Sequence, residues 1–423
     1  MSKPIFYCAL FLMLVGGVLA GNGLEHEAAA TADDDSELAE AAEPGEAAEA
    51  GVTIQSAEAA EPVEPAEPAA EDLRPDDYRN WSILPLPVTG YNPDLGVILG
   101  ASAILLYGPD IGVPEELVTG AASNTASLIA MYTTSGSFVL GGGVRQYLMQ
   151  DRWLLDAGVS FRRTPQDYWG IGPAAGAANP ESYTADSYSL RLGGGREFVP
   201  NLYLGSRLSY RYYALAELET DGELIGQGVG NGSETGQFPS LGLWLRYDST
   251  EGNASPYRGI LAVVELDGYA GLWGSSLDYS VLRVDLRQYT RVHREQVLGV
   301  QLLYRQGFGD VPFFDLPGLG GDNIFRGYPS RRFRDMTAVS LQGEYRLPLP
   351  GRFGLVGFAS VGQVGSSPAD LRLLAGGTAG LKLAGGAGVR FRVGDARQGL
   401  NLRVDAAFSA EGFGPYINAG EAF

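Results

Sequence analysis

Long segments of the sequence alternate apolar and charged residues with a period of two. In Leu282–Tyr289, apolar side chains take every second position, and Arg283, Asp285 and Arg287 lie between them. Because side chains of a β-strand point alternately to its two faces, this period predicts strands with one apolar and one charged face. A soluble β-sandwich also alternates, but segments of about 9–15 residues with charges on one face favour a transmembrane barrel with an aqueous lumen. The pattern recurs in Leu202–Tyr213 and Leu400–Phe408.

Strand counting gives an all-β fold, a 16-stranded antiparallel transmembrane β-barrel. No run of about 18 apolar residues follows residue 20, so we expect no transmembrane helix. The predicted strands are 83–90, 95–107, 124–133, 136–148, 153–163, 185–196, 202–215, 236–249, 258–272, 278–292, 296–308, 336–347, 353–366, 379–393, 399–409 and 414–423. The first of them is unusual because it contains Pro85 and Pro87. An even number of strands is typical of single-chain bacterial barrels and places both chain ends in the periplasm.

The N-terminal 80 residues differ in composition from the rest. Lys3 precedes an apolar stretch from Ile5 to Leu19, and Ala20 offers a small-residue cleavage site, so residues 1–20 are predicted to be a secretory signal peptide. An uncleaved anchor is the alternative. Residues 21–80 carry eighteen acidic residues against two arginines, and we expect a disordered acidic periplasmic segment. Residues 81–423 would then form the barrel, with a net charge of only −5 out of −20 for the chain.

Residues suited to catalysis or metal binding are scarce. The only cysteine, Cys8, lies in the predicted signal peptide, and the only histidines are His26 in the acidic segment and His293 at a predicted periplasmic turn. A hydrolase barrel generally needs a histidine base near a nucleophile. The sequence therefore predicts no enzymatic activity, no cofactor, no metal site and no nucleic-acid partner.

One long connection, Leu316–Asp335, stands out between two strongly alternating segments. It reads LPGLGGDNIFRGYPSRRFRD and contains four arginines against two aspartates. A loop of this length without regular structure is usually functional. From composition alone, a solvated surface loop and a loop folded into a polar lumen both remain open.

Residues 320–328 of this connection, GGDNIFRGY, resemble the (V/L/I/F)-R-G-(F/Y) signature of the BamA/TamA-like superfamily of outer-membrane assembly and translocation barrels, the bacterial surface antigen family. The resemblance implies that the loop plugs the lumen. The residues that carry this motif are Gly320, Gly321, Phe325, Arg326, Gly327 and Tyr328. The assembly-type members carry polypeptide-transport-associated domains before the barrel, and here we expect only the acidic segment.

The resemblance also implies acceptors for Arg326, a Glu and an Asp on the two strands that follow the loop. Glu344 occupies the first position, but Ser360 occupies the second. The predicted clamp therefore rests on Glu344 with Ser360 as a neutral second acceptor, and Asp405 on a nearby inward face is a possible substitute. Replacing Ser360 by Asp would then be expected to tighten the loop.

The C-terminus resembles the assembly signal of outer-membrane barrels, which ends in an aromatic residue. The predicted last strand places Ile417, Ala419 and Phe423 on its outward face, with Glu421 on the same face at the rim. The residues assigned to this signal are Tyr416, Ile417, Gly420 and Phe423.

The resemblance implies an integral protein of the bacterial outer membrane that inserts or transports outer-membrane protein or lipid. A passive pore narrowed by its loop and a membrane anchor without transport are the alternatives. The expected partners are outer-membrane lipid, either lipopolysaccharide or phospholipid, the barrel-assembly machinery during biogenesis, and a client polypeptide or lipid.

Overall fold

The computed structural model describes residues 81–108, 124–149, 151–175, 180–218, 235–252, 255–371, 380–393 and 400–423. The predicted signal peptide and acidic segment, residues 1–80, lie outside the described residues, as does most of the segment between the second and third predicted strands, residues 108–123. Within the described part, no helix is long and apolar enough to cross a membrane.

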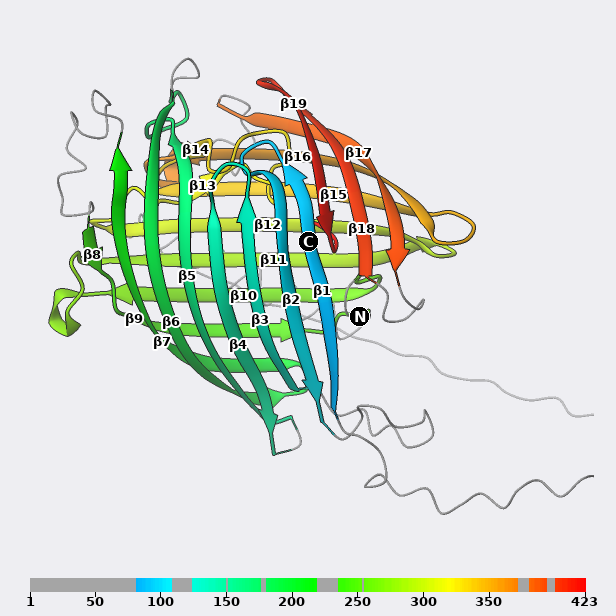
Figure 1. Ribbon diagram of the computed structural model, residues 1–423, viewed down its shortest axis with the longest axis horizontal. Coiled ribbons are helices and arrows are strands. Elements are labelled where there is room, and N and C mark those ends of the chain that lie inside the picture. The colour runs from blue at the N-terminus through cyan, green and yellow to red at the C-terminus, as the bar shows by residue number, and fades with distance from the viewer. Residues whose placement is uncertain are drawn as a thin grey trace, which may run out of the picture. The chain divides into compact units, whose positions relative to one another are not determined.

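The strands form one antiparallel sheet that closes on itself as a 16-stranded barrel (Figure 1). The first half contains β1 (Trp81–Asn92), β2 (Gly96–Tyr107), β3 (Asn124–Thr133), β4 (Phe138–Leu148), β5 (Trp153–Tyr168), β6 (Glu181–Val199), β7 (Leu202–Leu218), and β8 (Thr235–Gln237) with β9 (Ser240–Asp248). The second half contains β10 (Gly259–Tyr269), β11 (Tyr279–His293), β12 (Gln296–Gly309), β15 (Thr337–Pro348), β16 (Phe353–Gly365), β17 (Lys382–Val393), β18 (Leu400–Ser409) and β19 (Gly412–Ala419). Main-chain hydrogen bonds between Phe238 and Arg211 join β8 and β9 into one strand beside β7.

The predicted alternation appears in the burial of the side chains, but in the opposite sense to a soluble protein, with apolar side chains exposed and charged ones buried. On β18, the apolar side chain of Val404 is 51% exposed, whereas its neighbours Arg403 and Asp405 are each 1% exposed. On β15, Leu341 faces outward and Glu344 is buried. An exposed apolar exterior around a charged interior is the arrangement of a barrel that lies in lipid.

All sixteen predicted strands are present, most with boundaries within a few residues. The first strand tolerates its two prolines because of its place in the sheet. Pro85 and Pro87 pair with β2 on one side, and their part of β1 has no strand partner on the β19 side among the described residues. Proline lacks a backbone N–H, so an edge with few hydrogen bonds accommodates it.

The end of the chain differs from the prediction. The last strand ends at Ala419 rather than at Phe423, because Gly420 has a φ of +87° and turns the chain. Phe423 is therefore not on the outward face: it is buried with Tyr289 and Val297. Glu421 is not at an outward rim either, since its side chain is only 3% exposed and meets arginines inside the barrel.

The connection between β12 and β15 folds into a compact unit. It contains a small hairpin, β13 (Gly318–Leu319) and β14 (Phe333–Arg334). Phe313 and Phe314 belong to one hydrophobic cluster with side chains of β6, β7 and β11, and Phe325 belongs to a second. Two 3-10 helices, η3 (Gly271–Trp273) and η4 (Pro368–Asp370), lie in other connections.

Candidate functional site

The motif residues of the long connection form a tight turn. Gly320, Gly321 and Gly327 all have positive φ angles, as does Phe325 with a φ of +66°. A Cβ at Gly320 would lie 1.9 Å from the carbonyl oxygen of Pro329, which only glycine avoids. The rings of Phe325 and Tyr328 stack with centroids 5.5 Å apart.

This turn directs Arg326 to two carboxylates on different strands. Its Nη2 donates to Glu344 Oε2 on β15 at 2.8 Å, and its Nη1 donates to Asp405 Oδ2 on β18 at 2.5 Å. The guanidinium also lies over the ring of Phe358, 3.6 Å from its centroid. Arg326 is 1% exposed and both carboxylate side chains are fully buried. Two charge-assisted hydrogen bonds to fixed strands hold the loop tip in one position.

Two further arginines complete the network around these carboxylates. Arg390 Nη1 donates to Asp405 Oδ1 at 2.6 Å, and Arg346 Nε donates to Glu344 Oε1 at 2.9 Å. A Cβ at Gly388 would lie 2.0 Å from Asp405 Oδ1, so glycine leaves room for this carboxylate. Burial of charge is tolerated when each charge has a partner of opposite sign.

The C-terminal tail supplies the third carboxylate of the network. Arg390 Nε donates to Glu421 Oε2 at 2.8 Å, and Asn401 Nδ2 donates to Glu421 Oε1 at 2.7 Å. Arg346 Nη2 donates to the backbone oxygen of Phe423 at 2.8 Å. We name this set the lumen charge cluster: Arg326, Glu344, Arg346, Arg390, Asp405 and Glu421.

Ser360 does not serve as an acceptor for Arg326. Its hydroxyl donates to Gln342 Oε1 at 3.5 Å, and Gln342 Nε2 donates in turn to the loop carbonyl of Asn323 at 3.0 Å. Asp405 is instead the second carboxylate that accepts from Arg326. The sequence predicts Asp405 as a substitute acceptor, but not the roles of Arg346, Arg390 or Glu421. The inward alternation of β15 indicates Arg346. For the tail, the signals are Gly420 and an acidic side chain, Glu421, at a position predicted to face outward.

A second ion pair fixes Asp315, the residue directly before the long connection. Arg211 on β7 binds Asp315 with both terminal nitrogens, and Tyr279 donates its hydroxyl to Asp315 Oδ2 at 2.6 Å. Burial opposes ionisation of this carboxyl, but the Arg211 guanidinium outweighs it and holds the pKa of Asp315 below its ordinary value. The ring of Phe314 stacks on Tyr213 with centroids 3.8 Å apart.

The remaining loop arginines bind close to the loop itself. Arg332 Nε donates to Glu411 Oε2 at 2.8 Å, and its guanidinium lies 4.6 Å from the ring centroid of Trp169. Arg331 donates to the backbone oxygens of Phe314 and Leu316. The contacts of Arg331 stay within the connection between β12 and β15, whereas the ion pairs of Arg326 and Asp315 join this connection to β15, β18 and β7.

The seam between the first and last strands is the least paired junction of the barrel. Among the described residues, only Tyr91 and Ile417 pair across it, whereas β1 and β2 pair over twelve positions and β18 and β19 over eight. A Cβ at Gly90 would lie 2.4 Å from Ile417 O, so the strands approach closely at this one point. Beyond it, residues 81–88 of β1 have a strand partner only on the β2 side in the described part of the chain.

The residues assigned to the C-terminal signal lie on both sides of the wall. Ile417 is 44% exposed on the outer face, whereas Tyr416 is buried, and its hydroxyl accepts the backbone N–H of Gly327 at 2.9 Å. Gly420 makes the turn and Phe423 lies inside.

Among the described residues, no group of three or more His, Cys, Asp or Glu is arranged to hold a metal ion.

Comparison with known proteins gives one family. The model described as the Omp85 superfamily domain matches residues 131–409. No curated protein matches the chain.

Solved structures share the fold at low sequence identity. BamA from Haemophilus ducreyi, in a crystal structure that lacks POTRA domains 1–3, has a TM-score of 0.56 and 13% identity, with 81% of this chain and 70% of that chain covered. CdiB from Acinetobacter baumannii has a TM-score of 0.51 and 13% identity, with 81% and 60% covered. CdiB from Escherichia coli has a TM-score of 0.50 and 12% identity, with 79% and 62% covered. The chain thus spans less than two thirds of both CdiB structures.

Proposed function

Because this chain belongs to the Omp85 superfamily of outer-membrane barrels, we propose that it inserts or translocates polypeptide or lipid in that membrane by opening the seam between β1 and β19. Membership gives a general role in assembly or translocation. The particular activity is our proposal, as is a non-enzymatic mechanism.

The seam is the observation that carries this proposal. A backbone hydrogen bond contributes about 0.5–1.5 kcal/mol net, so parting strands joined at Tyr91 and Ile417 alone costs far less than parting β18 from β19. The edge of residues 81–88 presents backbone C=O groups and, except at Pro85 and Pro87, N–H groups. Such an edge is a template to which an extended client strand adds by main-chain hydrogen bonding.

The long connection favours this proposal over a passive pore. Its Arg326 forms ion pairs with β15 and β18, and Asp315, directly before it, forms one with β7. These strands lie in different parts of the wall. We propose that residues 316–335 plug the lumen. A plugged barrel would give small, unsteady conductance in a planar bilayer, and deleting the loop would raise it. Large, steady conductance of the intact protein would favour the pore instead.

A reversible crosslink across the seam tests the proposed route. Opposed residues of an antiparallel pair lie close enough for a disulfide, so the Tyr91→Cys/Ile417→Cys variant should close the seam when oxidised. The matched control is Thr89→Cys/Leu99→Cys, which joins β1 to β2 without touching the seam.

The two variants are compared in a strain that lacks the protein, by its outer-membrane protein and lipid content. We expect both to complement when reduced and only the control to complement when oxidised. Full complementation by the oxidised seam variant would refute the seam route. If the strain that lacks the protein has unchanged outer-membrane protein and lipid, the result would favour a membrane anchor without a transport role.

A further inference from the structure

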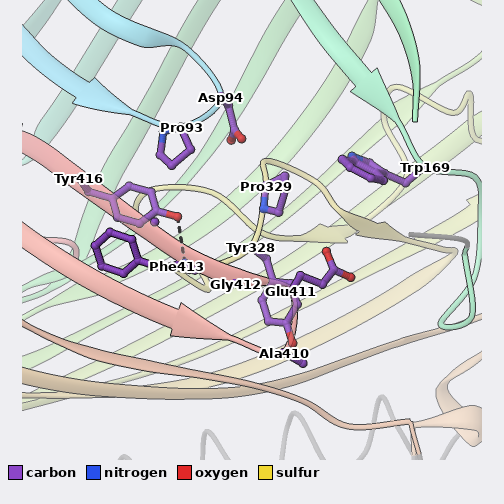
Figure 2. A pocket seen from close by; sticks show the side chains of 12 residues that line it. Pro93, Asp94, Trp169, Tyr328, Pro329, Ala410, Glu411, Gly412, Phe413 and Tyr416 are labelled. Atoms are coloured by element: carbon purple, nitrogen blue, oxygen red, sulfur yellow. Dashed lines mark hydrogen bonds between the residues drawn. The ribbon is translucent and has the colours of Figure 1, made fainter. Parts of the chain in front are cut away.

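A cavity of about 420 Å³ lies where three segments meet. The β1–β2 turn contributes Asp94, the tip of the long connection contributes Tyr328, and the β18–β19 turn with the start of β19 contributes Glu411, Phe413 and Tyr416. Figure 2 shows these side chains around one space, with the indole of Trp169 on the opposite side from Phe413 and Tyr416. The walls thus come from β19 and from the turn that follows β1, the two sides of the seam.

The cavity combines aromatic rings with carboxylates. Four of its lining side chains are aromatic, namely Trp169, Tyr328, Phe413 and Tyr416. Aromatic faces attract cations through the ring quadrupole, most strongly where water is excluded. The structure uses this chemistry at the edge of the same cavity, because the guanidinium of Arg332 lies over the Trp169 ring while it pairs with Glu411.

Asp94 is the carboxylate without a counter-charge. Its Oδ2 accepts the backbone N–H of Ser330 at 2.6 Å, and it forms no ion pair with any described residue. Burial chiefly raises the pKa of Asp94 to about 6, and its charged neighbours Asp167 and Asp322 act in the same direction. A half-buried carboxylate beside other carboxylates is stabilised when a cation joins it.

We propose that this cavity binds the cationic head, guanidinium or ammonium, of a basic side chain of a client polypeptide. The choice of an organic cation rests on the aromatic walls and on the lack of a metal-holding group among the described residues. The choice of a polypeptide rests on the proposed function, since the cavity adjoins the seam.

Calorimetric titration of the full-length protein in detergent tests the proposal. The probes are N-acetylarginine amide, its uncharged citrulline analogue, spermidine as a free amine, and a short arginine-containing peptide. We expect the arginine amide and the peptide to bind at least about tenfold more tightly than the citrulline analogue, since charge-assisted contacts are about twice as strong as neutral ones. Equal binding of the citrulline analogue would overturn the cation assignment, and binding of spermidine alone would overturn the peptide assignment.

Variants assign binding to the cavity. Asp94→Asn should weaken arginine amide about tenfold or more, and lowering the pH from about 7.5 to 5 should act in the same direction, because the carboxylate is protonated through its pKa near 6. Phe413→Ala removes a side chain that is 58% exposed, so it tests the aromatic wall with little effect on folding. Glu217→Gln, at a remote side chain with 69% exposure, is the matched control and should leave affinity unchanged.

These titrations are independent of the seam. Binding that is unaffected by both Asp94→Asn and Phe413→Ala would overturn the cavity assignment even if the seam crosslink blocks function. A crosslink without effect would refute the seam route, and cation binding would still be decided by the titrations.

Discussion

The ion pairs of Arg326 make a quantitative prediction about the loop. Arg326→Ala removes two charge-assisted hydrogen bonds, to Glu344 at 2.8 Å and to Asp405 at 2.5 Å, together with the contact over the Phe358 ring. Loss of one partner from a buried ion pair costs about 3–5 kcal/mol because the other charge stays buried alone. Here Arg346 still holds Glu344 and Arg390 still holds Asp405, so we expect the lower limit, about 3 kcal/mol.

This free energy applies to the equilibrium between the docked and the released loop. A change of about 3 kcal/mol is roughly a hundredfold in that equilibrium constant. Limited proteolysis within residues 310–336 should therefore accelerate by about that factor when opening and closing are fast relative to cleavage. Arg326→Lys keeps the charge but cannot reach both strands with a planar fork, so its acceleration should lie between those of wild type and Arg326→Ala.

A double-mutant cycle distinguishes this interaction from general loss of stability. Glu344→Gln keeps the shape of the side chain and removes its charge, and its effect should overlap with that of Arg326→Ala because both break the same pair. Arg352→Ala, at an exposed turn, is the matched control for removal of an arginine. Strictly additive effects, or equal proteolysis of Arg326→Ala and the Arg352 control, would refute the clamp.

Three further substitutions test other parts of the structure. Gly90→Val should push β1 and β19 apart at the seam, because even its Cβ would lie 2.4 Å from Ile417 O. We expect slower disulfide formation between cysteines introduced at positions 91 and 417. Ser360→Asp should destabilise the barrel by about 1–3 kcal/mol, in contrast to the tightening expected from the sequence, because Asp405 already accepts from Arg326 and the new charge would be buried beside Gln342. A lower temperature for the heat-induced gel shift would show this loss, and a higher one would contradict the assignment of Asp405. Glu421→Gln should release the tail from Arg390, and faster removal of the last residues by carboxypeptidase is expected.

The strands were predictable because one physical rule applies along their whole length. A lipid-facing side chain must be apolar and a lumen-facing one is free to be charged, so the period of two survives in nearly every strand. The prediction failed at the last strand because the alternation continues formally through Glu421 and Phe423. The acidic residue on the supposed lipid face was the sign of conflict, and the positive φ of Gly420 resolves it by turning the tail inward.

The loop site was only partly predictable. The motif gave Arg326 and Glu344, which lie 18 residues apart and join consecutive elements. Asp405 and Arg390 come from strands farther along the chain. Alternation predicts which face of the sheet each residue occupies, but it does not predict how far along the barrel axis the residue lies relative to residues of distant strands. Which inward carboxylate meets Arg326 therefore depends on the stagger of the whole barrel.

The lumen charge cluster links the loop to the seam through its ion pairs, and a further buried arginine, Arg403, lies 4.0 Å from Asp405. Its three arginines and three carboxylates each have partners, with Arg390 held between Asp405 and Glu421. Glu421 belongs to the tail that follows β19, whereas Arg326 belongs to the loop. If opening the seam moves β19 and withdraws Glu421, Arg390 loses one carboxylate and competes more strongly with Arg326 for Asp405. Opening the seam and loosening the loop would then be one coupled event, and a variant that loosens either should make the other easier.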